Sequence, residues 1–175
     1  SLVVDPDTFQ VLAPGEQGEI VVRGPQLLTG YWKKPNDYRD AWLVIDGKPF
    51  FRTGDLGRVD EDGYFFISDR LKRMINAAGY KVWPAEVEAT LYRHPAIQEC
   101  CIIASPDERR GETVKAVVVL KPGANASATD LLEWARGQMA AYKAPRKIEF
   151  ASELPRSGSG KIQWRVLQER EFPAV

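Results

Sequence analysis

The stretch PAEVEATLYRHPAIQECCIIASPDERRGETVKAVVVL, residues 84–120, decides the fold class of this chain. Its first part is typical of a helix, because Pro84 suits the first helical position and glutamates occupy the first turn. Val87 and Leu91 share one face of that helix. Two apolar runs typical of strands follow, at 97–104 and 113–120. A helix and two apolar strands in succession predict helices packed against a small sheet.

The pattern continues toward the C-terminus. Ser127 indicates the cap of a second helix, with Asp130 three residues on. Apolar residues then recur at helical spacing: Leu131, Ala135 and Met139. Lys147–Phe150 is predicted as a short edge strand and Ile162–Arg170 as a final helix. Residues 74–175 are therefore predicted to form a compact α+β domain.

The first part of the chain is predicted to be rich in short strands. Apolar runs bounded by glycine and proline indicate them at Val3-Val4, 18–25, 50–52 and 64–67. Asp60–Gly63 is a hairpin-turn signal, whereas 30–47 is expected to be loop-rich. The fold class is predicted as α+β: a small, barrel-like β module over 1–68, a connection at 69–73, and the α+β domain.

Composition excludes several function classes. The chain has 175 residues, 44% hydrophobic and 27% charged, as in soluble globular proteins. Its formal net charge of zero gives no basic surplus for nucleic acid. No apolar run approaches bilayer length and no signal peptide opens the chain, so a cytoplasmic location is expected.

The chain has few residues that could form a metal site or a Ser-His-Asp catalytic triad. Cys100 and Cys101 are adjacent, and neighbouring residues on a strand point to opposite faces, so they cannot jointly ligate a metal. The single histidine, His94, precedes Pro95 at an expected helix end, where a capping or surface role fits. No metal site is predicted.

Three segments carry residues suited to chemistry. Pro155–Lys161 is a glycine- and serine-rich loop with a lysine at its exit. It is no Walker loop, because Pro155 stands where that motif needs glycine and Ile162 follows the lysine. Arg52–Gly57 places Asp55 in a glycine-flanked turn, where it could bind a ribose diol or stabilise its own turn. Residues 76–82 combine small residues with a glycine, which admits either a slender ligand or tight packing.

These segments belong to a longer series of motifs, in the order GEIVVRGP (18–25), TGYW (29–32), FRTGDLG (51–57), DGY (62–64), DRLK (69–72), AGYKVWPAEVE (78–88), YKAPR (142–146) and SGSGK (157–161). The series resembles the C-terminal portion of the adenylate-forming acyl- and aryl-CoA ligases. The resemblance implies that residues 1–68 are the last subdomain of a large adenylation domain and that 74–175 are its mobile lid. Proteins of this superfamily join a carboxylate to ATP, giving an acyl-adenylate and pyrophosphate, and then transfer the acyl group to coenzyme A.

The resemblance also implies roles for single residues. Asp55 falls on the aspartate that binds the ribose hydroxyls of ATP or AMP, and Arg70 on an arginine that contacts ribose and phosphate. Lys81 matches a position that reaches nucleotide in some relatives. Lys161 matches the catalytic lysine of adenylation, which holds the carboxylate and the α-phosphate together.

The second half-reaction involves other residues. Lys72 matches the hinge about which the lid rotates, although the charge pattern of 69–73 by itself indicates a solvated connection. The coenzyme A path is implied for the residues Ala78, Gly79, Tyr80 and Arg110. Arg109 is adjacent to Arg110 and could serve in its place.

Further expectations concern substrates and partners. ATP, coenzyme A and a carboxylic acid are the expected ligands, with Mg²⁺ needed by the full-length enzyme and bound outside this chain. The pyrophosphate-binding loop of the superfamily is not among these residues, so the chain alone is predicted to be inactive. KVWPAEVE and YKAPR most resemble fatty-acyl ligases of medium or long chain, with aryl- or short-chain ligases and a noncatalytic binding module as alternatives. A lysine acetyltransferase or deacetylase acting on Lys161 is a possible partner.

Overall fold

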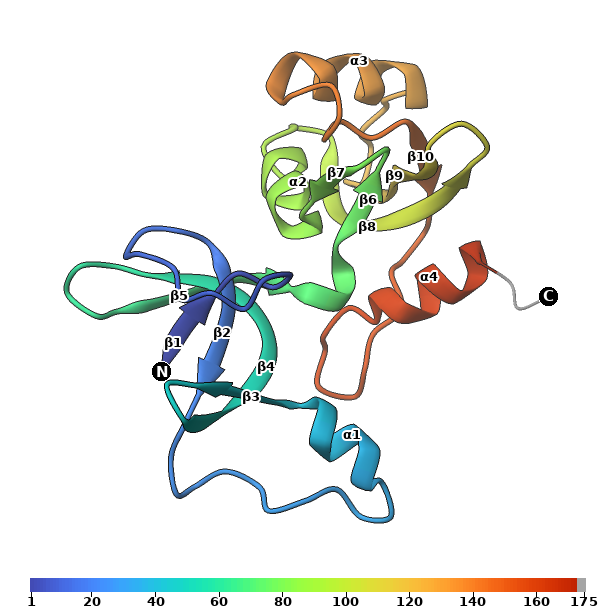
Figure 1. Ribbon diagram of the computed structural model, residues 1–175. Coiled ribbons are helices and arrows are strands. Elements are labelled where there is room, and N and C mark those ends of the chain that lie inside the picture. Colours follow the sequence, from blue (N-terminus) through green and yellow to red (C-terminus); the bar gives the residue numbers. More distant parts are fainter. Residues whose placement is uncertain (173–175) are drawn as a thin grey trace. The chain divides into compact units, whose positions relative to one another are not determined.

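The computed structural model describes residues 1–172 (Figure 1), apart from the side chains of Pro35 and Asp37. The chain divides into two compact units, Ser1–Lys72 and Arg73–Val175. The last three residues of the predicted lid domain, 173–175, lie outside the described part. The predicted α+β class is confirmed, since each unit is built on its own five-stranded sheet.

The first unit is an open, antiparallel sheet. Its strands are β1 (Leu2–Val4), β2 (Gly18–Val22), β3 (Trp42–Ile45), β4 (Lys48–Val59) and β5 (Phe65–Arg70). They run in the order β1-β2-β4-β3, and β5 pairs with the last part of β4. No pairing among the described residues closes this sheet into a barrel, so the barrel-like expectation was wrong in that detail.

Two local predictions for the first unit had different outcomes. The turn at Asp60–Gly63 is confirmed: the Asp60 carboxylate accepts the backbone N–H groups of Asp62 and Tyr64, and Gly63 has a φ of 85°. The loop expected over 30–47 instead contains helix α1 (Pro35–Asp40) and strand β3. The Trp42 ring packs edge-on against two aromatic rings, Tyr38 and Phe51, and contacts of this kind are not visible in local composition.

The second unit is a mixed sheet with helices on both faces. Its strands are β6 (Ile75–Ala77), β7 (Tyr80–Val82), β8 (Ile97–Asp107), β9 (Gly111–Leu120) and β10 (Lys147–Phe150). β9 is the central strand, since it pairs antiparallel with β6 and β8 and parallel with β10. The 3-10 turn η1 (Leu71–Arg73) leads into this sheet, and the helices are α2 (Pro84–Leu91), α3 (Ala128–Gln138) and α4 (Trp164–Glu171).

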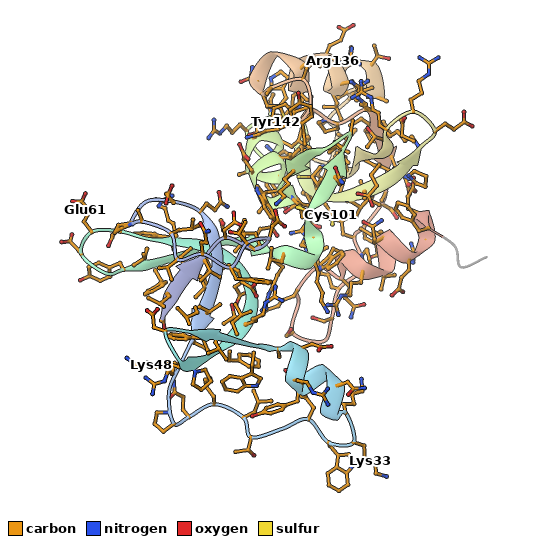
Figure 2. All side chains as sticks on the ribbon, viewed as in Figure 1. Lys33, Lys48, Glu61, Cys101, Arg136 and Tyr142 are labelled. Atoms are coloured by element: carbon orange, nitrogen blue, oxygen red, sulfur yellow. The ribbon has the colours of Figure 1, made fainter. Side chains whose placement is uncertain are left out.

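Strand alternation divides the core of the second unit into two layers. Cys100 packs in the layer under α2 and α3, together with Leu91 and Leu131. Cys101 packs in the layer under α4, against Leu167 (Figures 1 and 2). The prediction that the two cysteines face opposite ways is therefore confirmed. Burial raises the pKa of each thiol to about 12, so both stay protonated at neutral pH.

The helix starts follow local chemistry. Pro84 occupies the first turn of α2, and Ser127 and Asp130 form the predicted capping box of α3. The last helix begins two residues later than predicted, at Trp164. Ile162 forms a β-bridge with Arg156, so the chain is still extended at that point.

Among the described residues, no helix has the length and apolar character that crossing a bilayer requires. The location inferred from the sequence stays a prediction.

Candidate functional site

Asp55 lies in a β-bulge of strand β4. The register of β2 against β4 breaks around Ile20, so that this one residue opposes three. The three are Thr53, Gly54 and Asp55. Gly54 has a φ of 70°, which glycine adopts without strain. The turn expected around Asp55 was therefore wrong: the glycine creates a distortion within a strand.

The buried carboxylate of Glu19 holds the bulge from below. Glu19 is only 1% exposed, and its Oε1 accepts the backbone N–H of Gly54 at 3.1 Å. Its Oε2 accepts two hydrogen bonds from the Arg52 guanidinium, at 2.9 and 2.8 Å. The Thr53 hydroxyl donates to the Ile20 carbonyl at 2.6 Å and accepts the Asp55 N–H at 3.0 Å. Reasoning from the sequence missed Glu19, although it stands in the GEIVVRGP motif.

Asp55 and Arg70 are brought together across β4 and β5. They occupy opposed register positions, and the Arg70 Nε lies 2.7 Å from the Asp55 Oδ1. Arg70 also donates to the Thr53 carbonyl at 3.3 Å, which links it to the bulge. Among the described residues no further partner engages the Asp55 Oδ2, and both side chains reach solvent. The pair can therefore accept hydroxyl donors and offer a cation on one face.

The charged stretch 69–73 is more structured than the solvated connection expected from its charges. Asp69 is 7% exposed, and its carboxylate accepts the backbone N–H of Arg70. The Arg73 side chain is only 14% exposed and forms an ion pair with Glu88. Lys72 alone in η1 is exposed, and the boundary between the two units falls directly after it.

The hairpin at Ala78-Gly79 joins β6 to β7. Ala78 and Gly79 have φ values of 57° and 88°, as a two-residue primed turn requires. The Asn76 side chain accepts the Gly79 N–H at 2.8 Å. A Cβ at position 79 would meet nothing within 4 Å, so tight packing is not the reason for this glycine. Lys81 follows on β7, exposed and opposite Asn76.

An open pocket of about 480 Å³ lies beside this hairpin. Three of the predicted coenzyme A residues line it, namely Ala78, Tyr80 and Arg110, whereas Gly79 does not. Arg109 lines it as well, so the geometry leaves the choice between the two arginines open. The Asp107 carboxylate accepts the backbone N–H groups of both and shapes their turn.

The pocket also contains residues that the sequence analysis did not single out. Arg146 adds a third guanidinium, and Tyr142, which is labelled in Figure 2, stacks on Tyr80 with the two ring centroids 4.8 Å apart. Both stand in the YKAPR motif, which was the available signal. Lys143 bonds to Glu86 on α2, and this hydrogen bond raises the pKa of the lysine against a smaller opposing effect of burial. Three arginines and two stacked rings suit a phosphorylated, aromatic ligand.

Lys161 is the last residue of a loop that hydrogen bonds close. The Ser157 N–H donates to the Lys161 carbonyl at 2.9 Å, and the Gly160 N–H donates to the Ser157 carbonyl at 2.8 Å. Arg156 donates to the Gly160 carbonyl at 2.6 Å and to Glu99 on β8 at 2.5 Å. Within residues 1–172, no hydrogen bond or ion pair engages the Lys161 ammonium, which is exposed. The loop thus presents an uncommitted cation.

The predicted residues are divided between the two units. The first unit carries Asp55 and Arg70, and the second carries Lys81, the pocket and Lys161. No group of three or more His, Cys, Asp and Glu side chains that could hold a metal occurs in the described part of the chain.

Comparison with known proteins gives a consistent result. Residues 86–161 match the family model described as the AMP-binding enzyme C-terminal domain. The chain is 48% identical over 169 residues to a long-chain-fatty-acid–CoA ligase of Bacillus subtilis, covering 94% of this chain and 29% of that protein. It is also 48% identical over 149 residues to a feruloyl-CoA synthase of an Amycolatopsis species, covering 85% and 30% respectively.

Comparison with solved structures supports the same family. The crystal structure of ATP-bound MatB from Rhodopseudomonas palustris matches with a TM-score of 0.89 at 38% identity, over 97% of this chain and 33% of that one. The chain thus spans about a third of the length of each of these proteins. By sequence and by fold, it belongs to the adenylate-forming acyl- and aryl-CoA ligase superfamily, as a C-terminal portion that carries the AMP-binding enzyme C-terminal domain.

Proposed function

We propose that this chain supplies the lid, the hinge and part of the nucleotide site of an ATP-dependent acyl-CoA ligase. The observation that carries the proposal is the Lys161 loop, which two backbone hydrogen bonds and Arg156 close while the lysine ammonium stays uncommitted. A side chain that holds two anions together needs a free positive charge at the end of a defined backbone. The acid, ATP and coenzyme A are proposed as substrates of the complete protein.

In the first half-reaction the carboxylate of the acid attacks the α-phosphate of ATP. A bond forms between the carboxylate oxygen and the α-phosphorus, which gives the acyl-adenylate, and the bond from that phosphorus to the pyrophosphate oxygen breaks. Lys161 lowers the barrier by neutralising the charge that builds as the two anions approach. Asp55 accepts the ribose hydroxyls at its Oδ2, while Arg70 holds Oδ1 and offers its charge to the phosphate region; Lys81 is a further nucleotide contact.

The lid then turns about Lys72 for the second half-reaction. Three observations support this position: Lys72 is exposed, it lies in a 3-10 turn, and the boundary between the two compact units falls directly after it in the chain. A hinge needs only one or two residues that absorb a change of φ and ψ.

Coenzyme A is proposed to enter along the hairpin and the arginine pocket. The pantetheine arm is narrow, and the exposed Ala78-Gly79 turn presents no bulky side chain to it. The phosphates and adenine of coenzyme A match the guanidinium groups of Arg110 and Arg146 and the Tyr80 ring. The thiol attacks the acyl carbon, and AMP leaves.

The substrate class we favour is a long-chain fatty acid. KVWPAEVE and YKAPR support it by likeness, and so does the similarity to the Bacillus ligase over almost the whole chain. An aromatic acid is the second candidate, since the feruloyl-CoA synthase is equally identical over a shorter span. A noncatalytic binding module is a third reading. Retention of four residues that serve the two half-reactions argues against it: Asp55, Arg70, Gly79 and Lys161.

Pyrophosphate release by the complete protein tests the proposal. The acids run from acetate to palmitate, with benzoate and ferulate beside them. We expect release to rise with chain length and to fall by about 10²- to 10³-fold in Lys161→Ala. The exposed Lys121→Ala serves as the control and should match wild type. If none of the acids supports pyrophosphate release, or if Lys161→Ala releases as much as wild type, the binding module becomes the better reading.

A further inference from the structure

The outer edge of β8 is covered by side chains instead of by a strand. β8 pairs with β9 along one edge. On the other edge the Ala104 N–H and carbonyl bond to the Gln168 side chain of α4, at 2.9 and 3.0 Å. The Ile102 N–H donates to Glu88 at 2.9 Å, and the Ile102 carbonyl accepts from Arg73 at 3.3 Å. Each side chain occupies the place of a strand partner, so the edge ties together elements that are far apart in the chain.

Arg73 has the most contacts in this group. Its two terminal nitrogens bond to the two carboxylate oxygens of Glu88, at 2.5 and 3.4 Å. One of them also donates to the Ile102 carbonyl. The guanidinium lies 5.8 Å from the ring centroid of Trp164, within cation–π range. The side chains of Arg73 and Glu88 are 14% and 17% exposed, so solvent screens this pair little.

Trp164 connects Arg73 to the lysine loop. It is the first residue of α4 and follows Lys161 by three positions. Between them, the Gln163 N–H donates to the Pro155 carbonyl at 2.8 Å, and Ile162 bridges to Arg156. The ring packs on the core layer that holds Cys101 and Leu167. Trp164 therefore ties the segment that follows Lys161 to this core layer.

We propose that Arg73 is a positioning residue for Lys161. Arg73 directly follows Lys72, so it is the first residue that moves with the lid. By holding Glu88, β8 and Trp164 at once, it joins the end of the hinge to the base of the lysine loop. The backbone change is thereby confined to Lys72 and the residues before it, and the loop turns with the hinge as one body. This inference rests on the proposed function of Lys72 and Lys161.

A purely structural role for Arg73 makes a different prediction. If Arg73 only stabilised the lid, its loss would lower both half-reactions together. As a positioning residue it should affect adenylation alone, because Lys161 acts in that step and has no role once the acyl-adenylate exists. The ratio of the two half-reactions is thus a readout that a structural role leaves unchanged.

The experiment measures the two half-reactions separately in the complete protein. Adenylation is followed by ATP–pyrophosphate exchange, and thioester formation is followed with supplied acyl-adenylate and coenzyme A. Arg73→Met removes both the charge and the planar set of guanidinium donors that binds Glu88. Arg73→Lys keeps the charge but not that set of donors. Trp164→Leu leaves the pair between Arg73 and Glu88 in place and removes the ring, together with its contact to Arg165. Arg93→Met, at an exposed arginine after α2, is the control.

We expect Arg73→Met and Trp164→Leu to lower adenylation by about ten- to a hundredfold, since small displacements of a catalytic group have effects of this size. Thioester formation in these variants should stay within about twofold of wild type. The adenylation rate of Arg73→Lys should lie between those of wild type and Arg73→Met. Equal losses in both half-reactions, or no loss in Trp164→Leu, would overturn the inference. If Lys161→Ala itself kept full exchange, the proposed function would fail instead, which separates the two failures.

Discussion

Glu19 and Arg52 form an ion pair beneath the bulge that carries Asp55, with Arg52 Nη2 2.8 Å from Glu19 Oε2. Glu19 is 1% exposed, whereas the Arg52 side chain is 29% exposed. The pair thus buries one charge almost completely, and the other carboxylate oxygen binds the backbone of Gly54. A buried carboxylate that binds Arg52 directly before the bulge and the Gly54 N–H within it stabilises that bulge.

Glu19→Gln should therefore destabilise the first unit. The amide oxygen can still accept the Gly54 N–H, but the charge that holds Arg52 is lost. Removing one member of a mostly buried ion pair costs about 3 kcal/mol. Urea unfolding followed by intrinsic tryptophan fluorescence measures this loss of stability. Glu61→Gln, in the exposed hairpin turn, is the matched control and should shift unfolding little. An equal shift in both variants would contradict this account.

Gly79→Ala should be destabilising although the site has room for a methyl group. The cost comes from the φ of 88°, which disfavours an L-residue by about 1–2 kcal/mol. Reduced freedom of the unfolded chain offsets about half of this, leaving about 1 kcal/mol.

Gly137→Ala is the matched control for that change. Gly137 lies in α3, also has nothing within 4 Å of a built Cβ, and has no positive φ. It should stabilise the protein by about 0.5–1 kcal/mol. Thermal unfolding of the two variants should move in opposite directions, and movement in the same direction would show that backbone conformation does not decide position 79.

Arg110→Met should raise the KM for coenzyme A while leaving pyrophosphate exchange unchanged. Removing a guanidinium that holds a phosphate loses a charge-assisted hydrogen bond of about 1.5–3 kcal/mol, or about a ten- to hundredfold change in KM. Arg146→Met should behave alike, because Arg146 lines the same pocket. Arg109→Met decides between the two neighbouring arginines, because Arg109 lines the same pocket. The arginine whose loss raises the KM more is the phosphate contact. A change in exchange rate in any of the three would place the pocket in the first half-reaction.

Arg156→Met should weaken adenylation through the shape of the lysine loop. Arg156 bonds to the Gly160 carbonyl and to Glu99, so its loss frees the turn that precedes Lys161. We expect about a tenfold lower exchange rate, with the thermal midpoint nearly unchanged because Arg156 is exposed. Arg170→Met, at an exposed arginine in the last turn of α4, controls for the loss of a surface charge.

The features that were predictable from the sequence depend on neighbouring residues. Pro84, the Ser127–Asp130 box and the alternation of Cys100 and Cys101 each act over a few positions, and each is present in the structure. Glu19 under the bulge, Arg73 on Trp164 and Tyr142 on Tyr80 join residues separated by tens of positions. No local pattern contains such contacts. The motifs placed the candidate residues, but the groups that hold them in position required the fold.

The docking of α4 should depend on pH through Glu171. Its carboxylate accepts hydrogen bonds from the Lys115 ammonium and from the buried Ser105 hydroxyl, both at 2.5 Å. Burial by itself would raise the pKa of Glu171, but the bonds from Lys115 and Ser105 outweigh it and hold the pKa below the ordinary value of 4.5. A carboxyl with a lowered pKa in the folded state contributes stability that is complete above its unfolded pKa. That contribution is lost as the pH falls through the folded value.

Glu171→Gln tests this directly. At pH 7 the variant should be about 2 kcal/mol less stable than wild type, because a charge-assisted pair with Lys115 becomes a neutral contact. The difference between the two unfolding midpoints should narrow as the pH falls below 4.5, and it should close below the lowered pKa of the folded state, where the wild-type carboxyl is neutral too. Glu169→Gln, exposed on the same helix, should keep a constant small difference from wild type across this range. A gap between Glu171→Gln and wild type that persists at low pH would mean that the shape of the side chain, and not its charge, holds α4 against β8 and β9.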